Sequence, residues 1–269
     1  MPFADVKRVI YKNNPLINVI CQLRFPRILS INESLPAGFQ DAIRVDYPLF
    51  NKSVEQEQHY AIDAAEDDTL SMPRLLQSER MNNYRFSSSD GIWHVNLTST
   101  FISLSTSRYE RWEDFLRRFK EPLDALFSIY KPSFFERVGL RYVDAFKRSV
   151  LGLEGSDWSE LVQPHALGFL SNPQIRNDVR NHNYMAELDV GDGAMAQIKT
   201  AMGNIGSIEN GQPVFDSELS FIVDSDLYFL RKEISELSNS LDYLHNVSTK
   251  LIRSLITEKL HQAMSPQEI

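Results

Sequence analysis

The spacing of apolar residues predicts two long amphipathic helices, one in each half of the chain. Between residues 112 and 130, aromatic and leucine side chains recur every three or four positions and charged side chains fall between them, as in a helix with one buried face. Pro122 lies inside this run, so we expect a kink there or two helices in series. A second run, from Leu237 to Ile256, predicts a final long helix that extends nearly to Met264.

Alternating and continuous apolar segments predict β-strands before the first of these helices and between the two. The expected strands cover residues 16–25, 84–86, 92–97, 101–104, 134–146, 184–188, 194–201 and 218–223, with a weaker candidate at 55–61. Short helices are expected at 34–47, with Ser34 as the N-cap, and around Trp158. Residues 164–181 are expected to form a loop, and residues 64–81 are an acidic and then basic connection whose structure the pattern does not define.

Two Asp-Gly dipeptides separate pairs of these strands. Asp90-Gly91 follows the strand at 84–86, and Asp192-Gly193 follows the strand at 184–188. Asp and Gly tolerate the positive φ angles of tight hairpin turns. Each dipeptide therefore predicts a β-hairpin.

The two halves of the chain show the same landmarks in the same order. Leu23-Arg24-Phe25 ends an apolar strand in the first half, and Leu140-Arg141-Tyr142 lies in a similar strand in the second. Asn83-Tyr84 precedes the first Asp-Gly turn, and Asn183-Tyr184 precedes the second. Each half then ends in a long helix, which indicates an internally duplicated plan.

We therefore predict an α+β fold made of two duplicated halves, residues 1–132 and 133–269, each with the order strand, helix, strands, long helix. Only short Pro and Gly breaks interrupt the chain, so the halves should form one structural unit. They would share a continuous, mainly antiparallel sheet with the long helices on one face. The uncovered face would then be a groove or saddle.

Composition and charge limit the classes of function. The chain has 269 residues, of which 42% are hydrophobic, enough to bury a full core. Its formal net charge of -8 opposes nonspecific attraction to nucleic acid, unless one face carries a local basic patch. The one cysteine, Cys21, allows no intrachain disulfide. The first residues do not resemble a secretory signal, and no run of residues is long and apolar enough to cross a bilayer. We expect a cytoplasmic protein.

Motifs for catalysis, metals and nucleotides are missing. The sequence has no Gly-x-Ser-x-Gly elbow, no phosphate-binding glycine loop and no pair of histidines at helical metal-binding spacing. The acidic stretch at 63–68 lacks the ligand spacing of a calcium loop and is interpreted as solvated. We expect no metal and no cofactor. Among the histidines, His245 stands out because it adjoins the apolar stripe of the last helix, where it would be a partly buried polar contact.

Arg24, Arg141 and His94 are the candidate binding residues. Side chains alternate along a strand, so Arg24 and Arg141 should face away from the core if their neighbours face toward it, and His94 should likewise oppose Trp93. The two arginines could pair with an anionic ligand or an acidic segment of a partner. Alternatively, each could pair with a carboxylate of a neighbouring strand.

Three segments resemble a known family. They are residues 14–26 (NPLINVICQLRFP), residues 137–143 (RVGLRYV) and the stretch 241–260, which contains His245. These motifs are similar to those of a sporadically distributed, uncharacterised family of bacterial and archaeal proteins of about 250–270 residues. The resemblance implies a prokaryotic protein with no assigned activity, and its patchy distribution is typical of genes in mobile or defence clusters. Asp144-Ala145 departs from the Asn and basic residue expected after the second motif.

These observations favour a non-enzymatic module that binds a protein or ligand on the open face of its sheet. The expected partner is a protein encoded nearby, and self-association stays open. An enzyme is the alternative, and its cleft would bring His94, Arg24 and Arg141 together with carboxylates. A saddle for nucleic acid is the third interpretation, and it would require a basic, aromatic face.

Overall fold

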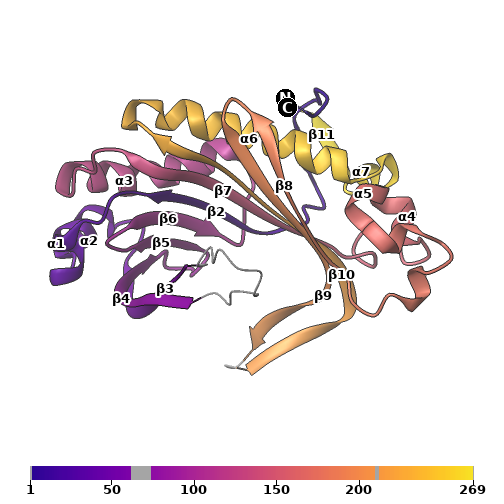
Figure 1. Cartoon of the computed structure of the whole chain (residues 1–269), viewed down its shortest axis with the longest axis horizontal. Coiled ribbons are helices and arrows are strands. Elements are labelled where there is room, and N and C mark those ends of the chain that lie inside the picture. Colours follow the sequence, from indigo (N-terminus) through magenta and orange to yellow (C-terminus); the bar gives the residue numbers. More distant parts are fainter. Residues whose placement is uncertain (1, 62–73, 210–211, 269) are drawn as a thin grey trace, which may run out of the picture.

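A nine-stranded antiparallel sheet forms the centre of the molecule (Figure 1). The structure, a computed structural model, describes residues 2–61, 74–209 and 212–268. The sheet strands are β2 (Leu16–Arg24), β3 (Leu49–Ala61), β4 (Arg74–Ser87), β5 (Trp93–Leu97), β6 (Phe101–Thr106), β7 (Phe135–Phe146), β8 (Asn183–Gly191), β9 (Ala194–Glu209) and β10 (Gln212–Lys232). The predicted α+β class and the antiparallel sheet are confirmed.

The spatial order of the strands is β3-β4-β5-β6-β2-β7-β10-β9-β8, and the sheet is open at both edges. β2 and β7 lie side by side in the middle, with Cys21 opposite Leu140. From there, β2 pairs outward with β6, and β7 pairs outward with β10. Strands from both parts of the chain therefore belong to one hydrogen-bonded sheet.

The two predicted long helices are α3 (Trp112–Ile129) and α6 (Leu237–Leu255). Phe115 of α3 packs against Trp93 of β5, and His245 of α6 bonds to Tyr142 of β7. Trp93 and Tyr142 belong to one row of opposed residues across β5, β6, β2 and β7, so both side chains lie on the same face of the sheet. Both long helices thus cover one face, which we call the helix face.

The helix face buries the core because the strands alternate in polarity. On this face, β2 buries Val19, Cys21 and Leu23, and β7 buries Val138, Leu140, Tyr142 and Phe146. The residues between them, such as Gln22, Arg24 and Arg141, are only partly buried. Pro122 lies within α3 and is buried, yet α3 is one continuous helix. Of the two predicted outcomes, two helices in series is therefore wrong, and a kink at Pro122 stays a prediction. The buried apolar contacts on either side of Pro122 keep the helix intact despite the lost amide donor.

The last predicted helix is also divided differently. α6 ends at Leu255, and a separate helix, α7 (Glu258–Ala263), follows. Ile256 between them is extended and forms an isolated β-bridge with Val162, and Thr257 caps α7 by accepting a hydrogen bond from the amide of Leu260. Leucine spacing predicted one helix because it contains no information about a β-bridge to a segment distant in the sequence.

Short helices connect the strands. They are α1 (Leu29–Glu33), α2 (Ala37–Ile43), α4 (Trp158–Leu161) and α5 (Pro164–Leu167), with 3₁₀ turns at Gly168–Ser171, Arg176–Asp178 and Ile234–Glu236. Ser34 ends α1 rather than capping a helix at 34–47, and α2 begins only after Pro36. The segment 164–181, predicted as loop, contains α5 and two of the 3₁₀ turns.

Both Asp-Gly hairpins are confirmed. β4 and β5 are joined through Asp90-Gly91, and β8 and β9 through Asp192-Gly193. Gly91, Asp192 and Gly193 have φ angles of 70°, 52° and 78°, which glycine and aspartate tolerate. The acidic stretch at 63–68 and the first part of the predicted connection lie outside the described residues.

The two ends of the chain form a small sheet that the sequence pattern did not predict. β1 (Val9–Tyr11) pairs antiparallel with β11 (Pro266–Glu268), and Figure 1 shows both termini beside α6. Among the residues described, no helix combines the length and apolar character needed to cross a bilayer.

Candidate functional site

The face of the sheet opposite α3 and α6, which we call the open face, carries all three predicted binding residues. Arg24, Arg141 and His94 occupy the strand positions that alternate with the buried apolar residues, as the parity argument predicted. Whether they bind anything stays a prediction.

The three residues do not meet in one cleft. His94, Ser105, Ile20 and Arg141 are opposed in one row across four strands, so His94 and Arg141 are about 14 Å apart at three strand spacings. Arg24 pairs with Arg137, four residues along β7 from Arg141, which places Arg24 and Arg141 about 14 Å apart as well. The convergence expected for the enzyme interpretation is therefore absent from these three residues.

Arg141 is paired within the sheet. Its guanidinium donates two hydrogen bonds to Asp224 of β10, at 2.7 Å from Nε and 2.6 Å from Nη2. These bonds are the main cause that raises the pKa of Arg141. The geometry matches the alternative in which a strand arginine pairs with a carboxylate of the next strand, which leaves Arg141 with less capacity for an external anion.

Gly139 makes room for a second arginine on the open face. The guanidinium of Arg137 lies over Gly139, bonds to Asp226 at 2.7 Å and stacks on Tyr228 at 4.5 Å from the ring centroid. A β-carbon at Gly139 would lie 2.0 Å from Nη1 of Arg137. The side chain of Arg137 would therefore have to leave both of its partners.

We expect Gly139→Ala to lower the free energy of unfolding by about 1 kcal/mol, the combined value of an exposed cation–π contact and a partly exposed ion pair. In an Arg137→Ala background the same change should be neutral or stabilise by about 0.5 kcal/mol, because alanine in a strand loses less backbone entropy than glycine. Urea denaturation of the four proteins in this double-mutant cycle measures both values. Equal losses in the two backgrounds would contradict the steric explanation.

A hollow of about 490 Å³ lies on the open face over β2, β6, β5 and β4. Its described lining residues are Asn18, Ile20, Gln22, Arg24, Met81, Asn83, Arg85, Asn96, Phe101, Ser103 and Ser105. Two of them are arginines and none is acidic. Arg85 donates from Nε to the side-chain oxygen of Asn96 at 3.1 Å, and Asn96 lies 3.4 Å from the hydroxyl of Ser103. The described part of the lining thus combines two arginines, of which Arg24 already has an interaction partner, with amide and hydroxyl groups.

His94 lies beside the hollow and does not line it. Its Nδ1 is 2.7 Å from the hydroxyl of Ser87 on β4. Burial, followed by the charge of Arg85, lowers the pKa of His94, so the neutral ring is favoured. His94 therefore adds a neutral hydrogen-bonding group to the open face and no positive charge at neutral pH.

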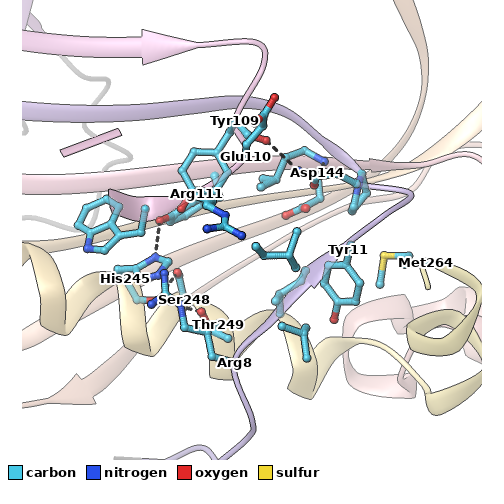
Figure 2. Close-up of a pocket in the computed structure, with 18 of the residues that line it drawn as sticks. Arg8, Tyr11, Tyr109, Glu110, Arg111, Asp144, His245, Ser248, Thr249 and Met264 are labelled. Atoms are coloured by element: carbon cyan, nitrogen blue, oxygen red, sulfur yellow. Dashed lines mark hydrogen bonds between the residues drawn. The ribbon is translucent and has the colours of Figure 1, made fainter. Parts of the chain in front are cut away.

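A second site lies on the helix face. A cavity of about 110 Å³ is enclosed by the N-terminal segment with β1, the loop before α3, the end of β7, and α6 (Figure 2). Asp144 of β7 lines it and is 5% exposed. Its carboxyl makes no hydrogen bond or ion pair with any described residue, and burial raises its pKa to about 7.

His245 of α6 connects the cavity to α3. Its ring stacks on Trp112 at 4.6 Å with 10° between the planes, and its Nδ1 is 2.9 Å from the hydroxyl of Tyr142. Burial lowers the pKa of His245 to about 4, so the ring is neutral near pH 7. Its Nε2 is buried and has no hydrogen-bond partner within the described part of the chain. The predicted partly buried contact at His245 is confirmed.

Sequence reasoning missed Asp144 as a site residue, although a signal existed. Val138, Leu140 and Tyr142 occupy the helix-face positions of β7, and Asp144 is the next residue of that series. An acidic residue at a core position of a strand is unusual unless it is paired or functional.

Within the described ranges, no three His, Cys, Asp or Glu side chains gather as metal ligands would. No protein-family model and no curated protein matches the chain.

Proposed function

We propose that the protein is a binding module that holds an acidic segment of a partner protein in the hollow of the open face. The observation that carries this proposal is the composition of the hollow: two arginines, several amide and hydroxyl groups, and no acidic side chain among its described lining residues. Arginine forms strong, directional hydrogen bonds with carboxylates. The volume of about 490 Å³ suits a few side chains of a docked segment.

The rest of the open face favours a short acidic segment over a nucleic acid. Asp224 and Asp226 of β10 and Glu187 of β8 share the face with Arg141 and Arg137. A nucleic acid that crossed the whole saddle would meet these carboxylates, and its phosphates would be repelled. A partner segment confined to the hollow would avoid them.

We also infer that the two halves arose by duplication. In support, β2 and β7 pair with each other at the centre, and each pairs outward with the last strand of its own meander, β6 or β10. A long helix follows each meander. β3 has no equivalent in the second half, which accounts for the unequal strand numbers on the two sides. The resemblance to a sporadically distributed prokaryotic family supports a partner encoded by a neighbouring gene.

Recovery of the tagged protein from its native host tests the proposal. We expect the wild type to retain a partner, and the Arg24→Ala/Arg85→Ala variant to bind the purified partner at least about tenfold more weakly, because each hydrogen bond to a charged group is worth about 1.5–3 kcal/mol. Arg44→Ala is the matched control, since Arg44 is exposed at the end of α2 and pairs only with Asp41 among the described residues.

The outcomes separate the three interpretations. If the double variant and the wild type bind the partner equally, or if no partner is recovered, the proposal is wrong. If a single-stranded oligonucleotide binds at low salt, and Arg24→Ala/Arg85→Ala removes that binding, the nucleic-acid interpretation replaces it.

A further inference from the structure

The cavity on the helix face has a wall made by the two ends of the chain. β1 pairs with β11, and the chain continues with hydrogen bonds from the amide of Lys12 to Ser265 and from that of Asn13 to Met264, at 3.2 and 3.0 Å. The hydroxyl of Tyr11 lies 2.8 Å from Nδ1 of His261. These contacts hold the N-terminal segment beside α6, so the cavity is a preformed feature of the fold.

Asp144 and Arg111 provide two charges of opposite sign with no partner. Both line the cavity, and neither side chain forms a hydrogen bond or ion pair with another described residue. Figure 2 shows the guanidinium of Arg111 reaching into the space on the side of Asp144, whereas Glu110 points away from it.

The other two arginines of the cavity are already neutralised by carboxylates. Arg8 pairs with Glu113 at 2.7 Å, and Arg253 pairs with Glu258 at 2.9 Å. Glu110 also lines the cavity without a partner but points away from the space (Figure 2), so the unpaired charges directed into it are one buried acid, Asp144, and one exposed base, Arg111. A ligand that carried only a positive charge would be repelled by Arg111, and a ligand that carried only a negative charge would be repelled by Asp144.

We propose that the cavity binds a small zwitterionic amino acid, with its ammonium group on Asp144 and its carboxylate on Arg111. The size agrees with the smallest amino acids, because a cavity of about 150 Å³ holds the six carbon atoms of benzene, and the same ratio gives about four or five non-hydrogen atoms for this one, of about 110 Å³. Tyr109 and Trp112 supply aromatic walls. The site is separate from the open face and does not depend on the function proposed for it.

The state of Asp144 supports the same ligand. Burial raises the pKa of Asp144 to about 7, so its ionised form is disfavoured in the empty cavity. The ammonium group of the ligand would stabilise this ionised form as it binds. Tyr11, Tyr109, Tyr142 and His245 surround the cavity, and burial favours the neutral form of each. They offer hydrogen bonds without adding charge.

Isothermal titration with glycine, alanine and β-alanine tests the proposal, since these probes vary the distance between the two charges. At least one should bind, and ethylammonium and propionate, which carry one charge each, should bind at least about tenfold more weakly. Asp144→Asn and Arg111→Ala should each lower the affinity for the amino acid by at least about tenfold. Asp124→Asn and Arg117→Ala, both exposed on α3, should change its affinity by less than about twofold.

The carboxyl resonance of Asp144, followed by NMR in the wild type, gives a second readout that needs no variant. Saturation with the amino acid should lower the pKa of this carboxyl. The proposal fails if none of the three amino acids binds, if a singly charged probe binds as well as they do, if either cavity variant retains full affinity, or if the titration of Asp144 does not respond.

Discussion

At pH 8, the Asp144→Asn variant is expected to be more stable than the wild type, with a free energy of unfolding up to about 4 kcal/mol higher. Burial raises the pKa of Asp144 from 3.8 to about 7, a shift of about three units, and each unit corresponds to about 1.4 kcal/mol. Above pH 7 the folded wild type must hold a buried, unpaired carboxylate. Asparagine has nearly the same shape and no charge to bury.

The gain should depend on pH in a defined window. The folded carboxyl keeps its proton up to a pH of about 7, whereas the unfolded one loses it near 3.8, so the folded wild type binds more protons between these values. Its stability contribution is complete below pH 3.8 and is lost as the pH rises through 7. The advantage of Asp144→Asn should therefore be near zero at pH 4 and largest above pH 7.

His245 contributes a slope of the opposite sign, so the variant must be compared with the wild type at each pH. Its pKa is lowered from 6.5 to about 4, and its contribution is lost as the pH falls through that window. Urea denaturation of both proteins from pH 4 to 8 isolates Asp144, and Asp124→Asn should stay within about 0.5 kcal/mol of the wild type throughout. A constant difference between Asp144→Asn and the wild type would contradict the burial of an unpaired carboxyl.

Trp112→Ala is expected to lower the free energy of unfolding by about 3–5 kcal/mol, the usual loss for a buried tryptophan. Trp112 is 4% exposed and stacks on His245 of α6 and on Phe115 of α3. Its Nε1 donates a hydrogen bond to Asp242 at 2.9 Å. The substitution would remove the side chain that joins the start of α3 to α6.

Two further variants identify the source of that loss. Trp112→Phe keeps an aromatic ring and removes the hydrogen bond to Asp242, so it should lose about 1–3 kcal/mol. Phe169→Ala removes an aromatic residue that is 74% exposed and should change stability by less than about 0.5 kcal/mol. Urea midpoints at a constant m-value provide the comparison. A loss below about 1 kcal/mol for Trp112→Ala would show that α3 and α6 do not depend on this contact.

Local patterns predicted much of the fold because alternation and helical spacing reflect burial along each segment. The strand parity that placed Arg24 and Arg141 on the open face needed only the period of two in residues 16–25 and 134–146. The Asp-Gly turns needed only the tolerance of these residues for positive φ. Predictions failed where a distant contact decided the outcome, as at Ile256, where the bridge to Val162 ends α6.

The candidate sites were less accessible to sequence reasoning. His245 was identified by its position beside an apolar stripe, but Trp112 and Tyr142 drew attention only as parts of a helix and a strand, and Asp144 only as a departure from the family motif. Their convergence requires β7, α3 and α6 to pack together, with the two ends of the chain adding the last wall. A burial pattern records that a residue faces inward and does not record which other segment it meets.

The sequence by itself determined the class of the fold, both hairpin turns and the face on which Arg24, Arg141 and His94 lie, because these follow from interactions between residues close in the chain. Only the tertiary structure decided that Arg141 is occupied by Asp224, that the hollow gathers Arg24 and Arg85, and that Asp144 lies without a partner in a cavity. Strand order and helix packing bring these groups together across long sequence separations, and local propensity contains no information about such pairings.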